Sequence, residues 1–178
     1  GLDANNGRLD ASEVRESLNF CFEPLRSARV TDLVPGIGDS FTTGCEAAAW
    51  MERSEAFVFA GNDGVNGCEL HVHRPGSNTT HLIADLNEGG DASPGRDLGL
   101  HPLNHGEAVV FDADDGVNGR QLWVSDGTTN GTEPLGAVET SLARPWAEGL
   151  LVRSTTNQLL WTNGCLLYTS DAADESRG

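Results

Sequence analysis

The chain has 178 residues, with 27 acidic and 11 basic side chains and a formal net charge of −16. This balance excludes nucleic acid and anionic membrane surfaces as favoured partners, because both carry negative charge. No run of about 18 apolar residues occurs, so the sequence predicts no membrane-spanning helix.

Residues 1–26 form an acidic segment that resembles a calcium-binding EF-hand loop followed by a short helix, Ser12–Asn19. Calcium prefers hard oxygen ligands, and a central glycine permits the bend that gathers them. The loop is one residue shorter than the EF-hand pattern, and the alternative is a solvated acidic turn. The resemblance predicts calcium as cofactor, with four ligands: Asp3, Asn5, Asp10 and Glu13.

Residues 27–164 alternate short apolar segments with turn residues, a pattern typical of β-structure. The segments fall into three units of four predicted strands, over 27–76, 77–131 and 132–164. The strands of the first unit are Val30–Leu33, Ala47–Met51, Ala56–Ala60 and Glu69–His73. Those of the second are Leu82–Leu86, Leu98–Leu103, Ala108–Ala113 and Gln121–Ser125. Those of the third are Leu135–Val138, Arg144–Ala147, Leu150–Arg153 and Gln158–Thr162.

The first two units share a hairpin, AFVFAGNDGVNGCELHVH at Ala56 and AVVFDADDGVNGRQLWVS at Ala108, with an offset of 52 residues. The identical DGVNG segments predict identical turns, because Asp, Asn and Gly tolerate tight-turn backbone. Repetition near fifty residues is typical of stacked units, and four strands match one propeller blade. We therefore expect an all-β fold, a partial β-propeller of three blades in an open arc.

The second hairpin continues as QLWVSDGTTNGT from Gln121 and resembles the ELWxxDGT repeat of exported bacterial and archaeal proteins. The match is weaker in the first hairpin, where His71 replaces the tryptophan. The resemblance implies propeller-like blades in a secreted or surface protein, mostly without an assigned activity. It therefore predicts an extracellular or cell-surface location in a bacterium.

Residues 165–178 fit no blade, and their back-translation is similar to a transposase adapter used in sequencing libraries. We expect this tail to be an artefact without ordered structure, and the chain to be a fragment. The four cysteines form no CxxC pair, which disfavours a zinc site. A Cys21–Cys45 disulfide is conceivable, although pairing cannot be read from sequence.

Several side chains could carry chemistry, and each has a structural alternative. Gly38-Asp39-Ser40 resembles the nucleophile block of GDS esterases. However, Asp97 and His101 do not have the spacing of the aspartate–histidine pair that supplies the catalytic base in those enzymes, and the repeat of the units explains the segment. His71 and His73 lie on one face of a strand and could bind a metal, or could pack. Two further sets remain: turn residues that could bind calcium or cap their own turns (Asp63, Asn66, Asp115 and Asn118), and tryptophans that could fill space between blades or stack on sugars (Trp50, Trp123, Trp146 and Trp161).

These patterns favour a non-enzymatic exported repeat protein that serves as a surface scaffold or binding module, with a protein or glycan as partner. The alternatives are a propeller-type hydrolase and a carbohydrate-binding lectin. A hydrolase requires an acid, a histidine and a nucleophile around one pocket. A lectin requires an exposed tryptophan beside paired carboxylates.

Overall fold

A computed structural model describes residues 33–34, 40–136, 140–154, 156–165 and 167–169. Within these ranges the chain forms β-strands, turns and loops, which confirms the all-β prediction. No helix in this part of the chain could span a membrane. The EF-hand-like segment, its expected helix and the expected strand Val30–Leu33, apart from its last residue, lie outside the described residues and stay predictions.

The strands form three antiparallel sheets, each built from four strands consecutive in the chain. Sheet 1 contains β1 (Ala48–Met51), β2 (Ala56–Asn62), β3 (Cys68–Arg74) and β4 (Thr79–Ala84). Sheet 2 contains β5 (His101–Leu103), β6 (Ala108–Asp114), β7 (Arg120–Ser125) and β8 (Thr132–Gly136). Sheet 3 contains β9 (Thr140–Trp146), β10 (Gly149–Ser154), β11 (Leu159–Thr162) and β12 (Leu167–Thr169).

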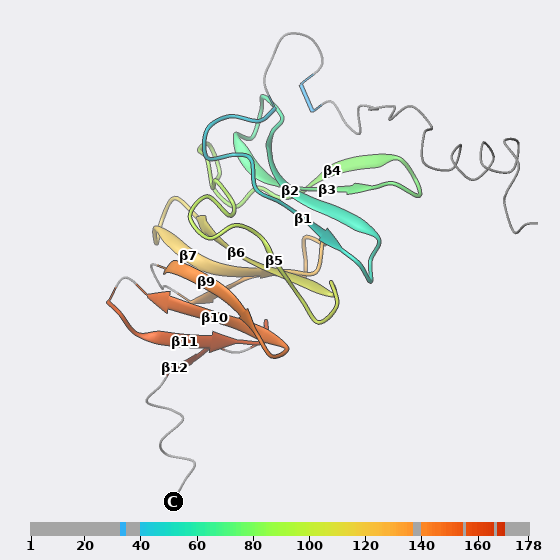
Figure 1. The fold of residues 1–178 in the computed structure, drawn as a ribbon. Coiled ribbons are helices and arrows are strands. Elements are labelled where there is room, and N and C mark those ends of the chain that lie inside the picture. The colour runs from blue at the N-terminus through green and yellow to red at the C-terminus, as the bar shows by residue number, and fades with distance from the viewer. Residues whose placement is uncertain (1–32, 35–39, 137–139, 155, 166, 170–178) are drawn as a thin grey trace, which may run out of the picture.

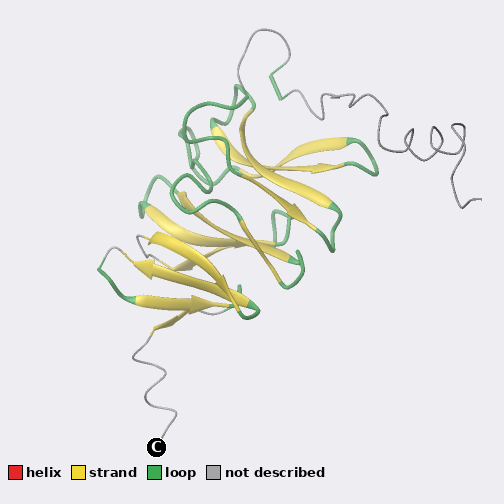
Figure 2. Ribbon diagram, viewed as in Figure 1, coloured by secondary structure: helices red, strands yellow, loops and turns green. Residues whose placement is uncertain are grey.

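The three sheets stack face to face in chain order, with sheet 2 in the middle (Figures 1 and 2). One apolar core lies between sheets 1 and 2 and includes Val58, Leu70 and Phe111. A second core lies between sheets 2 and 3 and includes Val110 and Leu150. Because side chains alternate along a strand, β6 contributes side chains to both cores. Burial of both faces of this strand explains its nearly continuous apolar sequence.

Sheets 1 and 2 have the same strand register when residue numbers are shifted by 52. In sheet 1, Val58 pairs with Val72; in sheet 2, Val110 pairs with Val124. Both sheets also carry an irregularity at one position, after Leu70 in β3 and after Leu122 in β7. The two segments therefore share their backbone pairing as well as their sequence.

The sheet boundaries differ from the boundaries of the predicted units. The segment expected at Leu82–Leu86 to open the second unit is instead β4, which pairs with β3 in sheet 1. Likewise, Leu135 and Gly136, the described residues of the segment expected at Leu135–Val138 to open the third unit, belong to β8, which pairs with β7 in sheet 2. Each of these strands follows its partner after a short loop, and a short loop favours antiparallel pairing with the preceding strand.

The C-terminal tail also departs from expectation at one point. β12 pairs with β11 through Leu160 and Thr169, so the prediction that residues 165–178 lack ordered structure is wrong for Leu167–Thr169. The adapter interpretation of the tail stays a prediction.

Candidate functional site

The two DGVNG turns are held by the same set of hydrogen bonds. The Asp63 Oδ1 atom accepts the backbone N–H groups of Val65 and Asn66 at 2.9 and 2.8 Å. The Asp115 Oδ1 atom accepts those of Val117 and Asn118 at 2.9 and 2.6 Å. In each turn the asparagine side-chain amide donates to the second carboxylate oxygen at 2.7 Å.

These contacts shift the acidity of both carboxyl groups. Hydrogen bonds from the side chain and backbone of Asn118, and from the Val117 N–H, lower the pKa of Asp115 to about 2. Burial acts to raise the pKa of Asp63, but the hydrogen bonds from Asn66 and Val65 outweigh it, so the pKa is lowered. The carboxylates are thus committed to their own turns, which supports the capping alternative over a calcium role for these four residues.

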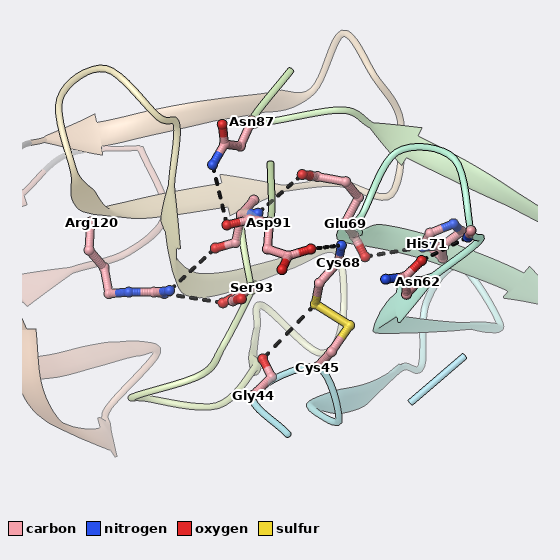
Figure 3. Close-up of a disulfide and its surroundings, with 12 residues drawn as sticks. Gly44, Cys45, Asn62, Cys68, Glu69, His71, Asn87, Asp91, Ser93 and Arg120 are labelled. Carbon is pink, nitrogen blue, oxygen red and sulfur yellow. Dashed lines mark hydrogen bonds between the residues drawn. A yellow bond between two sulfur atoms is a disulfide. The ribbon is translucent and has the colours of Figure 1, made fainter. Parts of the chain in front are cut away.

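A disulfide joins Cys45 to Cys68, the first residue of β3, so the conceived Cys21–Cys45 bridge is wrong (Figure 3). The sulfurs pack with Ala60 in a small core of their own. A disulfide of this kind is typical of proteins that fold in an oxidising compartment.

The matching positions of sheet 2, shifted by 52, hold an ion cluster instead. The guanidinium of Arg120 lies 2.5 Å from a carboxylate oxygen of Asp112 and 3.4 Å from one of Asp97. The Asp112 side chain is fully buried, and that of Arg120 is 12% exposed. The buried Asp112 carboxylate also accepts the Leu98 N–H at 2.8 Å, so both a cation and a backbone donor compensate its burial.

Charged side chains from both sheets fix the crossover segment, residues 85–100, which connects β4 to β5. Glu69 accepts the N–H groups of Leu86 and Ala92 at 2.8 and 3.2 Å, and Arg120 donates to the carbonyl of Ser93 at 3.1 Å (Figure 3). The Asp91 carboxylate accepts the Cys68 N–H at 2.7 Å. The acidic residues of this region therefore anchor a loop.

The pKa of Glu69 is strongly perturbed. Burial raises the pKa of its carboxyl to about 7, although the hydrogen bonds from the Leu86 and Ala92 N–H groups act in the opposite direction. The matching residue in sheet 2 is the neutral Gln121, whose amide donates to Asp115. A carboxyl that titrates near neutral pH is a common property of catalytic acids, but here it faces backbone amides of the crossover segment.

The histidines proposed as metal ligands take part in separate contacts. The His71 ring is buried, stacks on Phe59 with centroids 5.8 Å apart, and contacts the Glu69 carbonyl through Nδ1 at 3.1 Å. Burial lowers its pKa. His73 Nδ1 lies 2.7 Å from the Thr80 hydroxyl. The part of the chain that the structure describes brings together no group of three or more His, Cys, Asp or Glu side chains suited to a metal.

The esterase-like segment lies only partly within the described ranges, since Gly38 and Asp39 fall outside them. The Ser40 carbonyl accepts the Asn62 N–H at 2.8 Å, and the matching Ala92 carbonyl accepts the Asp114 N–H at 3.0 Å. Ser40 thus occupies a position that both sheets use for backbone pairing, which agrees with the repeat-based alternative.

The four tryptophans do not share one environment. Trp123 is buried in the core between sheets 1 and 2, as expected for a packing residue. Trp50 is 41% exposed with its ring centroid 4.6 Å from that of Phe57, and Trp146 is 60% exposed. The expectation that each fills space between sheets is therefore wrong for these two, because they lie on the outer faces of the stack.

A cleft of about 400 Å³ opens where hairpin turns of the three sheets meet. The β1–β2 turn contacts the β5–β6 turn through an Arg53–Glu107 ion pair of 2.9 Å and an Arg53 N–H to His105 carbonyl bond. Gly106 has a φ of 80°, and a Cβ there would lie 2.2 Å from the Glu52 nitrogen, so the approach requires glycine. Pro145, Ala147, Glu148 and Gly149 of the β9–β10 hairpin complete the lining, together with Pro102, Leu103 and Asn104.

No protein-family model matches the chain, and comparison with curated proteins finds no relative. The ELWxxDGT resemblance therefore stays a prediction.

Proposed function

We propose that this chain is a non-enzymatic, propeller-like repeat module of an exported bacterial protein, and that it serves as a surface scaffold or binding module. The observation that carries the proposal is the matched pairing of sheets 1 and 2. The same registers and turn bonds recur 52 residues apart, as expected of repeated blades.

The use of the polar side chains supports a scaffold. Asp63 and Asp115 cap turns, while Glu69 and Arg120 fix the crossover segment. Chemistry-bearing groups are thus distributed over several structural contacts, whereas an enzyme gathers acid, base and nucleophile around one pocket. The Cys45–Cys68 disulfide supports export to an oxidising compartment.

A fluorophosphonate probe, which labels activated serines, tests the scaffold against the hydrolase alternative. The scaffold role predicts no labelling of the full chain beyond that of a Ser40→Ala variant. Stoichiometric labelling of wild type that Ser40→Ala abolishes would establish the hydrolase instead.

Calcium is proposed at Asp3, Asn5, Asp10 and Glu13, on the strength of the EF-hand-like sequence alone. Calorimetric titration of the full chain should show binding at or below about 10⁻³ M, the weak limit of extracellular calcium modules. A Glu13→Ala variant should lose the signal, and an Asp115→Ala variant should keep it. Loss in Asp115→Ala alone would place the ion at the DGVNG turn.

The lectin alternative rests on the cleft, where Glu107 and Glu148 supply carboxylates between apolar walls. Neither exposed tryptophan is among its lining residues, so the arrangement expected of a lectin is met only in part. A glycan array probed with wild type and with Glu148→Gln tests it, with Glu133→Gln on β8 as the control. Retained glycan binding in Glu148→Gln would exclude the cleft as the site.

A further inference from the structure

The two outer faces of the stack both expose large apolar side chains. We call the face of sheet 1 that points away from sheet 2 the front face; Trp50 and Phe57 lie on it as cross-strand partners, each 41% exposed. The face of sheet 3 that points away from sheet 2 is the rear face, with Trp146 at 60%, Leu159 at 53% and Leu142 at 37% exposure. Large exposed apolar side chains gathered on one face mark an interaction site.

Both faces correspond to surfaces that are buried inside the stack. Phe57 of the front face matches Val109 of sheet 2, which is fully buried against sheet 1. The rear face of sheet 3 corresponds to the face of sheet 2 that packs on sheet 3, where Val110 and Leu122 are buried. Each sheet thus packs its rear face on the front face of the next, and only the two ends of the described stack lack this cover.

We propose that a second copy of this chain supplies the cover, with the rear face of sheet 3 in one copy packed on the front face of sheet 1 in the other. The inference rests on the proposed blade arrangement. The proposed contact repeats the packing of rear face on front face that already occurs between sheets 1 and 2 and between sheets 2 and 3. Head-to-tail contacts close into a ring when the rotation permits, and two copies supply six sheets, within the roughly four to eight blades of closed propellers.

Charge at the two faces agrees with this pairing. Arg144 is exposed on β9, in line with Leu142 and Trp146 of the rear face. Glu46 is exposed just before β1, in line with Trp50 of the front face. The pairing brings opposite charges to one interface in a chain of formal net charge −16, where random contacts between copies repel.

Light scattering after gel filtration, over a range of concentrations, tests the proposal. Wild type should have twice the 18.9 kDa mass of one chain. Trp50→Glu and Trp146→Glu should each give monomers, because every interface uses one front face and one rear face. Val117→Glu, at an 86% exposed turn position, should leave the dimer intact.

Mixing the two monomeric variants sharpens the test. The intact rear face of Trp50→Glu can pack on the intact front face of Trp146→Glu, so the mixture should recover dimer through one interface. Loss of dimer in Trp50→Glu but not in Trp146→Glu would overturn the proposal in favour of a front-to-front contact. A wild-type monomer with intact β-sheet circular dichroism would also overturn it, while leaving the scaffold role to the separate probe-labelling test.

Discussion

Sheets 1 and 2 differ most at three matched positions beside the crossover. At sheet 1, Cys45 and Cys68 form a disulfide that packs with Ala60 in a small apolar core. The matched residues at sheet 2, Asp97 of the crossover segment with Asp112 and Arg120 of β6 and β7, form a partly buried ion cluster. The strand registers around the two sets are nevertheless the same.

The backbone of the unit is therefore set by other residues, namely the DGVNG turn and the alternating apolar side chains. The three matched positions then accept either of two cross-links. The cross-links stabilise by different routes, since a disulfide mainly restricts the unfolded chain, whereas an ion cluster depends on complete pairing in the folded state. Sheet 1 should therefore respond to reductant, and sheet 2 to loss of one charge.

The largest effect is expected for Arg120→Ala, which leaves the buried Asp112 carboxylate without its cation. The free energy of unfolding should fall by about 3 to 5 kcal/mol. The double variant Asp112→Ala/Arg120→Ala, which copies Ala60 of sheet 1, should be less destabilised than the single one. Denaturant unfolding measures both, and Arg96→Ala, whose ion pair with Asp97 is exposed, is the control. Equal losses in Arg120→Ala and Arg96→Ala would contradict the buried cluster.

Removal of the disulfide comes next. The double variant Cys45→Ala/Cys68→Ala lacks the cross-link between positions 23 residues apart. Because its unfolded chain is less restricted, the free energy of unfolding should fall by roughly 3 kcal/mol. Reductant should destabilise wild type by a similar amount and leave the double variant unchanged. Cys165→Ser is the control, since this cysteine is free and exposed. A wild type indifferent to reductant would show that the bridge does not form in solution.

Glu69 should make stability fall as pH rises. Its folded pKa of about 7 lies above the ordinary glutamate pKa of 4.5, so the folded state binds more protons between these limits. The stabilisation that comes from protonated Glu69 is fully present below pH 4.5 and is lost as the pH rises through 7. The free energy of unfolding should fall by roughly 2 to 3 kcal/mol over this range. Glu69→Gln, which copies Gln121, should remove this part of the slope in pH-dependent unfolding. An unchanged slope in the variant would assign it to another group.

The smallest effects concern the last glycine of each DGVNG turn. Gly67 and Gly119 both have positive φ, 81° and 75°, so alanine at either position costs about 1 kcal/mol in backbone strain. A Cβ at Gly67 would also lie 2.3 Å from the Gly90 carbonyl oxygen, whereas one at Gly119 meets nothing within 4 Å. Thermal unfolding should therefore rank Gly67→Ala as the less stable. The reverse order would mean that the crossover segment does not pack on the first turn.

Local pattern was sufficient to predict the all-β class, the DGVNG turns and most strands, because side-chain alternation and turn chemistry are local. Local pattern was not sufficient to group the strands into sheets, because the sheet to which β4 or β8 belongs depends on the neighbour with which the strand pairs. The Cys45–Cys68 bridge carried a signal that was missed. At an offset of 52 these cysteines match Asp97 and Arg120, an opposite-charge pair, and the match indicates spatial contact. The exposure of Trp50 and Trp146 required knowledge of which sheets end the stack.

We claim that sheets 1 and 2 are two copies of the same structural unit with interchangeable cross-links, and moving the disulfide tests this claim. The triple variant Asp97→Cys/Asp112→Ala/Arg120→Cys places the three sheet 1 residues at the matched positions of sheet 2. Peptide mapping and thiol counting under oxidising conditions should find a second disulfide between positions 97 and 120, with no more free thiols than wild type. Two additional free thiols in a folded variant would contradict the claim.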